Sequence, residues 1–238
     1  MPERGPISWE RRRELGFFRA VWMTWRDSLF SPDAFWRQVH PTERTQDALF
    51  YAWLMAVVSA VLTVLVQAPL QLAQARMREA NGSSGASGLL AMLPDLPDNA
   101  ERVLSGMMTP GGSILLGVLG VGFTALLYPL QLVIVSAILH LFAVLFGASK
   151  HGYWATFRVV SYSSGAMIFS VLPCIGIFAV LYMYVLQGWG LVRVQETTAA
   201  RATFTMLALP VVACCLACAG FAAAMMALAA SMSSLGVQ

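Results

Sequence analysis

The sequence predicts an all-α, polytopic integral membrane protein with five transmembrane helices, preceded by an amphipathic N-terminal interfacial helix. Of the 238 residues, 58% are hydrophobic and only 11% are charged, less than half the usual charged share. Apolar stretches long enough to cross the ~30 Å hydrocarbon core of a bilayer recur along the chain. Eight arginines precede the first of these stretches: Arg4, Arg11, Arg12, Arg13, Arg19, Arg26, Arg37 and Arg44. This distribution excludes a water-soluble globular domain.

Residues 9–30 are expected to form the amphipathic helix. Apolar residues recur there at alternating steps of three and four: Leu15, Phe18, Trp22, Trp25 and Leu29. Arg12, Arg19 and Arg26 line the other side. Such a helix lies in the headgroup region, with its aromatic face in the membrane and its arginines on anionic lipid. Packing against the protein's own cytoplasmic side is the alternative, and both arrangements can hold together.

A second short helix is expected after Ser31 and Pro32, because this pair supplies an N-cap followed by a proline at the first helical position. These elements make residues 1–46 a cytoplasmic N-terminal region. The membrane domain follows over residues 47–232, and residues 233–238 form a short tail.

Five spans are expected within the membrane domain, at about 48–70, 113–146, 153–172, 174–192 and 204–230. Residues 73–112 contain "NGSSGASG" and are expected to form a mobile extracytoplasmic loop. The stretch 113–146 has no formal charge and predicts one long helix, tilted or kinked at Pro129. Pro173 and Gly176 leave almost no loop between the third and fourth spans, which predicts a tight antiparallel hairpin.

The positive-inside rule orients these spans with the N-terminus in the cytoplasm and the C-terminus outside. The inner side then holds the eight leading arginines with Lys150, Arg193 and Arg201. The outer side holds only Arg76, Arg78 and Arg102. A single lysine among fifteen basic residues and the abundant alanine indicate a GC-rich bacterial source, and therefore the bacterial cytoplasmic (inner) membrane.

A polar segment, "FRVVSYSS", opens the third span. Arg158 is expected near the cytoplasmic interface, where its guanidinium reaches headgroups. The hydroxyls that follow it usually bond to a neighbouring helix or to backbone carbonyls. Two interpretations stay open, a polar seam between packed helices and a lipid-headgroup or partner site. The residues concerned are Arg158, Tyr162, Ser163 and Gln187.

Together with its surroundings, this segment resembles the Yip-domain family of Ypt- and Rab-interacting integral membrane proteins. The pieces that carry the resemblance are "LFSPDAFW", "ILHLFAVLFG", "FRVVSYSS", "PCIGIFAVLYMYVLQGWGL" and "TTAARA". Their family-like structural residues are Ser31, Pro32, His140, Gly147, Pro173, Gly176 and Gly190. The resemblance implies a five-span bundle with a cytoplasmic N-terminus and, in eukaryotic relatives, Rab binding and vesicle traffic. Ala166 stands where relatives often have proline, and Gln195 where many have histidine.

The predicted spans contain no Asp or Glu, which argues against a coupled ion transporter, a carboxylate metal site and the paired acids of many hydrolases. His140 is therefore expected to be a hydrogen-bonded histidine rather than a proton carrier. Cysteines fall within or beside apolar runs, as expected of helix-packing residues: Cys174, Cys214, Cys215 and Cys218. No catalytic residue, metal site or cofactor is predicted.

These observations favour a non-enzymatic membrane protein that organises the membrane, acts in trafficking or recruits a partner. The expected partners are the bilayer, with anionic lipids at the N-terminal helix, and an unidentified membrane or cytoplasmic protein. Small residues on the spans would also permit a homo-oligomer, and nucleic acid is not an expected partner. The alternative is a small transporter or lipid-handling protein that uses the polar seam around Arg158 and Tyr162.

Overall fold

A computed structural model describes residues 5–80, 106–107, 109–172 and 175–234, and all regular elements of these residues are helical. Four helices are long and apolar enough to cross a membrane: Thr45–Met77, Gly111–Leu145, Gly176–Val194 and Ala199–Met226. The chain is therefore an all-α integral membrane protein, as the sequence predicts.

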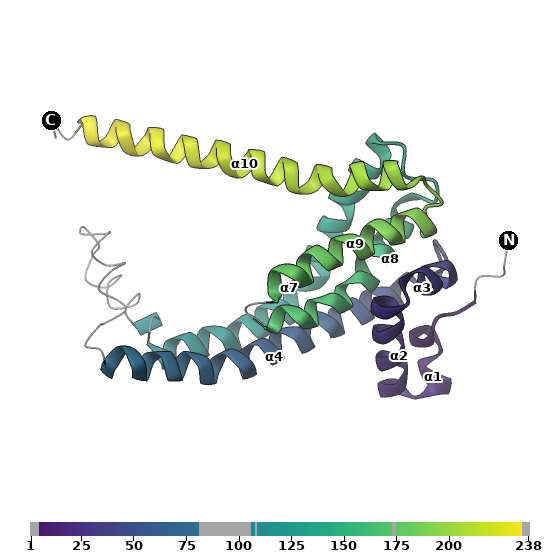
Figure 1. The fold of residues 1–238 in the computed structure, drawn as a ribbon, viewed down its shortest axis with the longest axis horizontal. Coiled ribbons are helices and arrows are strands. Elements are labelled where there is room, and N and C mark those ends of the chain that lie inside the picture. Colours follow the sequence, from purple (N-terminus) through teal and green to yellow (C-terminus); the bar gives the residue numbers. More distant parts are fainter. Residues whose placement is uncertain (1–4, 81–105, 108, 173–174, 235–238) are drawn as a thin grey trace.

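Four short helices form a layer at one end of the long helices (Figure 1). They are η1 (Ser8–Arg11), α1 (Arg12–Leu15), α2 (Phe17–Phe30) and α3 (Pro32–Gln38); together we call them the N-terminal layer. The single helix expected over 9–30 is wrong, because the chain breaks at Gly16, whose φ of +84° lies in the left-handed region that favours glycine. α3 begins as predicted, with Ser31 at the N-cap position and Pro32 inside the first turn.

The first two spans form a hairpin of long helices, α4 (Thr45–Ala80) and α7 (Pro110–Leu145), which run side by side (Figure 1). Each has 36 residues, or about 54 Å of helix. α7 is one continuous helix with Pro129 inside it, as predicted. The expected loop 73–112 is too long at both ends, since strong helix formers such as "LAQARMREA" carry α4 to Ala80. The rest of that loop lies mostly outside the described residues.

The third predicted span, 153–172, is not one membrane-spanning α-helix. It consists of α8 (Gly152–Ser163) followed by the 3-10 helix η2 (Ser164–Val171), and it is not among the four candidate spans. Serine hydroxyls in this stretch bond to backbone carbonyls: Ser163 Oγ to Val159 O at 2.7 Å and Ser164 Oγ to Ser161 O at 2.7 Å. Such bonds compete with the regular helical pattern.

The last two spans are α9 (Gly176–Val194) and α10 (Ala199–Ser234). Only a few residues separate η2 from α9, as a tight hairpin requires, although Pro173 lies outside the described residues. α10 begins beside α9 and α7 and then leads away from the other helices (Figure 1).

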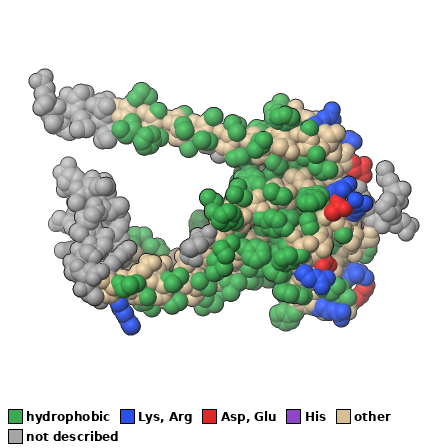
Figure 2. Space-filling view, in the orientation of Figure 1, with side chains coloured by type: hydrophobic (Ala, Val, Ile, Leu, Met, Phe, Trp, Pro, Cys, Tyr) green, Lys and Arg blue, Asp and Glu red, His purple; other side chains and the backbone are tan. Residues whose placement is uncertain are grey.

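The buried core joins the N-terminal layer to the membrane helices. Its largest side chains without solvent exposure are aromatic or charged: Trp9, Trp36, Arg158, Tyr51 and Tyr162. On the face seen in Figure 2, most charged side chains gather at this end of the molecule, and hydrophobic side chains are spread over the rest of the described surface. The best-packed region of the chain therefore lies where the charged layer meets the bundle.

Candidate functional site

A buried ion pair holds the N-terminal layer against the bundle. Nη2 of Arg158, on α8, lies 2.5 Å from Oε1 of Glu10, on η1. The Tyr162 hydroxyl, one helical turn after Arg158, donates to the same carboxylate oxygen at 3.3 Å. The side chain of Arg158 has no exposure and that of Glu10 only 5%. The guanidinium therefore reaches a carboxylate of the same chain, and not the headgroups where sequence analysis placed it.

Burial makes this pair energetically important. A charge removed from water is strongly destabilised unless an opposite charge compensates it. The Arg158 guanidinium also lies over the Tyr162 ring, 5.6 Å from its centroid, within the range of a cation–π contact. Its Nε and Nη1 atoms have no hydrogen-bond partner among the described residues. Glu10 is thus the compensating group for Arg158.

The other two residues of the predicted seam are also buried. Ser163 has no exposure and Gln187 has 4%. The Ser163 hydroxyl donates its hydrogen bond to the Val159 carbonyl within α8. In the described part of the chain, no hydrogen bond joins Gln187 to Arg158 or Tyr162. The four residues lie in packed interior rather than around an open path.

Further contacts fasten the N-terminal layer to α4 and η2. The Trp9 indole donates to the Asp47 carbonyl at 2.6 Å, and Arg12 pairs with the Asp47 carboxylate at 2.7 Å. Arg12 was expected to face lipid, but this ion pair turns it toward α4. The Trp25 indole donates to the Gly165 carbonyl of η2 at 3.0 Å.

Asp33 ties α3 to the end of α9. Its carboxylate lies 2.6 Å from Nη2 of Arg193 and 2.8 Å from Nη2 of Arg37. Desolvation by itself would raise the pKa of Asp33, but hydrogen bonds and charge interactions with the two arginines outweigh it and lower the pKa below its ordinary value of 3.8. This group is therefore ionised throughout the neutral pH range.

The aromatic face predicted for residues 9–30 is divided between core and surface. Leu29 is buried and Trp25 half-buried, while Phe18 is 85% and Trp22 59% exposed. Phe18 and Trp22 border an apolar groove between α2 and α4 that also includes Val58. Arg19 is exposed on the same helix, and Arg26 pairs with its neighbour Asp27 at 2.7 Å.

Another buried polar group centres on Gln195, just after α9. Its Oε1 accepts from the backbone amides of Lys150 at 3.0 Å and His151 at 2.7 Å, ahead of α8. Its Nε2 donates to Thr156 Oγ1 at 2.9 Å, and His140 Nδ1 lies 3.1 Å from the same oxygen. His140 is thus hydrogen-bonded, as predicted, and Gln195 joins the end of α9 to α8 and, through Thr156, to His140 of α7.

The described residues contain no group of three or more His, Cys, Asp or Glu side chains that could hold a metal ion. Among them, Cys214, Cys215 and Cys218 are free and exposed on α10.

The Yip1 domain model matches residues 26–222. This chain belongs to the Yip1 family. No curated protein and no solved structure matches it. The matched range begins within α2, so Glu10 lies outside it, while Arg158 and Tyr162 lie inside.

The structure explains why glycine is required at two positions of the Yip1-like pieces, Gly147 and Gly190. Gly147 has φ of +64° and ends α7 with a Schellman pattern, in which the Ala148 amide donates to Ala143 O at 2.7 Å. A Cβ atom on Gly190 would lie 2.7 Å from Cγ1 of Val159, so α9 approaches α8 too closely for a side chain. Gly176 begins α9.

Sequence reasoning missed Glu10 as the partner of Arg158. The two residues are 148 positions apart, and no local pattern connects them. The available signal was a mismatch: an arginine inside an apolar stretch needs an acid, and the predicted spans contain none. The acid therefore had to come from outside the predicted spans.

Proposed function

We propose that this Yip1-family chain is a non-enzymatic membrane protein that crosses the bilayer five times and presents its N-terminal layer at the cytoplasmic face. There it recruits a protein partner or organises other membrane proteins. The gathering of charged side chains at the end occupied by the N-terminal layer (Figure 2) supports this orientation, because positive charge favours the cytoplasmic side.

The combined element α8–η2 provides the third crossing in this proposal. Its 12 α-helical and eight 3-10 residues give about 34 Å at rises of about 1.5 and 2.0 Å per residue. That length exceeds the ~30 Å hydrocarbon core. Backbone groups of η2 receive partners from other elements, such as Ser59 Oγ on Met167 O at 2.8 Å, which non-α backbone within a membrane requires.

The exposure of Phe18 and Trp22 is the observation that carries the membrane-surface role. Phe18 and Trp22 expose most of their surface, and Arg19 beside them is exposed as well. Aromatic rings favour the headgroup boundary, and arginine favours anionic lipid. The N-terminal layer therefore rests on the membrane surface while Glu10 and Arg158 hold it to the bundle.

No observation favours the alternative of transport through the seam. Arg158 and Tyr162 are buried and share the Glu10 carboxylate. A transport path would require these groups to face an open, hydrated passage.

Tryptophan quenching in proteoliposomes tests the surface position. The full chain is reconstituted with phosphatidylglycerol brominated near the headgroup, and the variants Trp22→Phe and Trp36→Phe are compared. Trp22 is 59% exposed and Trp36 fully buried, so quenching should fall in Trp22→Phe and stay unchanged in Trp36→Phe. Equal quenching in both variants would contradict lipid contact by α2.

Photocrosslinking in native membranes tests partner recruitment. A crosslinking residue at Gln38, exposed on α3, should give discrete protein adducts. The control position is Leu126, which is 77% exposed on the membrane helix α7; a crosslinking residue there should give lipid adducts. Lipid adducts alone from both positions would contradict recruitment by the N-terminal layer.

A further inference from the structure

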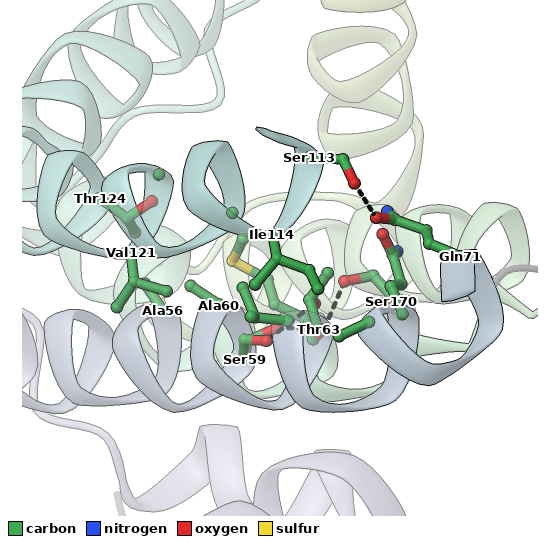
Figure 3. Close-up of a pocket in the computed structure, with 16 residues that line it drawn as sticks. Ala56, Ser59, Ala60, Thr63, Gln71, Ser113, Ile114, Val121, Thr124 and Ser170 are labelled. Atoms are coloured by element: carbon green, nitrogen blue, oxygen red, sulfur yellow. Dashed lines mark hydrogen bonds between the residues drawn. The ribbon is translucent and has the colours of Figure 1, made fainter. Parts of the chain in front are cut away.

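A groove of about 340 Å³ opens between α4, α7 and the end of η2. This volume lies within the range of small-molecule sites, about 300–1,000 Å³. Figure 3 shows Ser113 of α7 and Gln71 of α4 directed toward one another across it. Its polar lining residues are Ser59, Thr63, Gln67, Gln71, Ser113, Thr124 and Ser170.

The lining contains hydroxyl and amide groups but no ionisable side chain. A phosphate-bearing headgroup would find no cation there, and a metal ion no carboxylate, imidazole or thiolate. Glutamine amides both donate and accept hydrogen bonds. The chemistry therefore suits an uncharged group that also does both, which is a property of hydroxyls.

The groove extends along the middle of α4. Ala56 and Gln71, at its two ends, are 15 positions apart, or about 22 Å along a helix. Since the hydrocarbon core is ~30 Å thick, the groove covers the depth from the membrane surface remote from the N-terminal layer to just past the bilayer centre. That is the position of a lipid headgroup and the first part of its acyl chains.

Two polar groups of α4 near the inner end are already engaged. Ser59 Oγ donates to Met167 O at 2.8 Å, and Thr63 Oγ1 donates to Ser59 O at 2.8 Å. Toward the membrane surface, Ser113 Oγ donates to Gln71 Oε1 at 2.6 Å (Figure 3). In the described part of the chain, the Gln67 amide and the Thr124 hydroxyl have no hydrogen-bond partner. Thr124 lies at the inner end, since the neighbouring Ala125 carbonyl accepts from the Trp53 indole of α4 at 2.7 Å, whereas Gln67 lies toward the membrane surface. Unpaired polar groups in a membrane are costly, so Gln67 is available to a headgroup.

We propose that this groove binds an uncharged, hydroxyl-bearing lipid headgroup of the diacylglycerol class. The headgroup hydroxyl exchanges hydrogen bonds with Gln67, and an acyl chain follows the apolar wall formed by Val64 and Val121 toward the inner end. Gly120 leaves the α7 wall open, because a Cβ there would meet no atom within 4 Å. This site is separate from the N-terminal layer and does not depend on the proposed recruitment role.

Photolabelling with a photoactivatable diacylglycerol tests this site in nanodiscs of phosphatidylcholine. Adducts should fall within 59–71 and 113–124. Unlabelled diacylglycerol should compete at least tenfold better than phosphatidic acid with the same chains. Equal competition by the two lipids, or adducts confined to other segments, would overturn the proposal.

Two glycines of α7 offer a matched pair of variants. Gly120→Leu places a side chain in the groove, whereas Gly122→Leu adds the same side chain where Gly122 is exposed and not part of the lining. Labelling should fall at least tenfold in Gly120→Leu and stay unchanged in Gly122→Leu; equal labelling would overturn the site. Should Gly120→Leu fail to fold, Gln67→Leu, which keeps a side chain of similar size, should lower labelling several-fold, and unchanged labelling there would equally overturn the site.

Discussion

Replacing Glu10 by glutamine should release the N-terminal layer from the bundle. The substitution keeps the shape and an acceptor oxygen but leaves the Arg158 guanidinium as an uncompensated charge with no exposure. Breaking a buried pair by removing one charge costs about 3–5 kcal/mol. Because Arg158 regains water or headgroups when the layer detaches, this cost acts on the docking equilibrium.

Limited proteolysis in detergent micelles measures that equilibrium. Trypsin cleavage at Arg19, within α2, requires local opening, and its rate follows the open population when closing is fast. A cost of about 3–5 kcal/mol corresponds to an increase between about 100-fold and several thousand-fold. Asp27→Asn, which breaks the exposed Arg26–Asp27 pair, is the control and should change the rate less than about fivefold.

A double-mutant cycle separates the charge effect from lost packing. Arg158→Met alone leaves the Glu10 carboxylate buried without a partner, whereas Glu10→Gln/Arg158→Met leaves no buried charge. The double variant should therefore open less than either single variant, with a coupling energy of several kcal/mol. The reasoning is refuted if Glu10→Gln behaves like Asp27→Asn, or if the double variant shows the sum of the two single effects.

Three further predictions concern the helices around this pair, each measured by thermal unfolding in micelles. Gly190→Ala should cost about 1–3 kcal/mol, because the new Cβ would lie 2.7 Å from Val159 Cγ1; an unchanged midpoint would contradict that close approach. Gln195→Leu should cost about 1–3 kcal/mol through unpaired amides before α8, and a stabilising effect would contradict its connecting role. Arg37 and Arg193 lower the pKa of Asp33 in the folded state. The ionised Asp33 therefore stabilises the folded protein above its ordinary pKa, and this stabilisation is lost as pH falls through the folded-state pKa. Asp33→Asn should remove this contribution to the loss of stability in acid.

Sequence reasoning located the long apolar helices well because their signal is local. The continuous helix through Pro129 and its end near Phe146 both followed from the length of the uncharged stretch. Hydrophobic length alone could not set how far α4 continues, because its last turns to Ala80 are good helix formers outside the apolar core.

The features that the sequence did not reveal depend on contacts between segments far apart in the chain. The 3-10 geometry of η2 depends on partners such as Trp25, which donates to Gly165 O, and Ser59, which donates to Met167 O. Both donors come from segments more than 100 positions away. The sequence likewise could not identify Glu10 as the partner of Arg158, because the two residues meet only when the N-terminal layer packs against the bundle.

The location of the C-terminus tests the central claim of five crossings most directly. A dual reporter fused after Gln238, active either only in the cytoplasm or only outside it, is compared with the same reporter placed before the first residue. The five-pass account predicts a cytoplasmic signal from the N-terminal fusion and an extracytoplasmic signal from the C-terminal fusion. Cytoplasmic signals from both would contradict it, and would mean that α8–η2 does not cross the membrane.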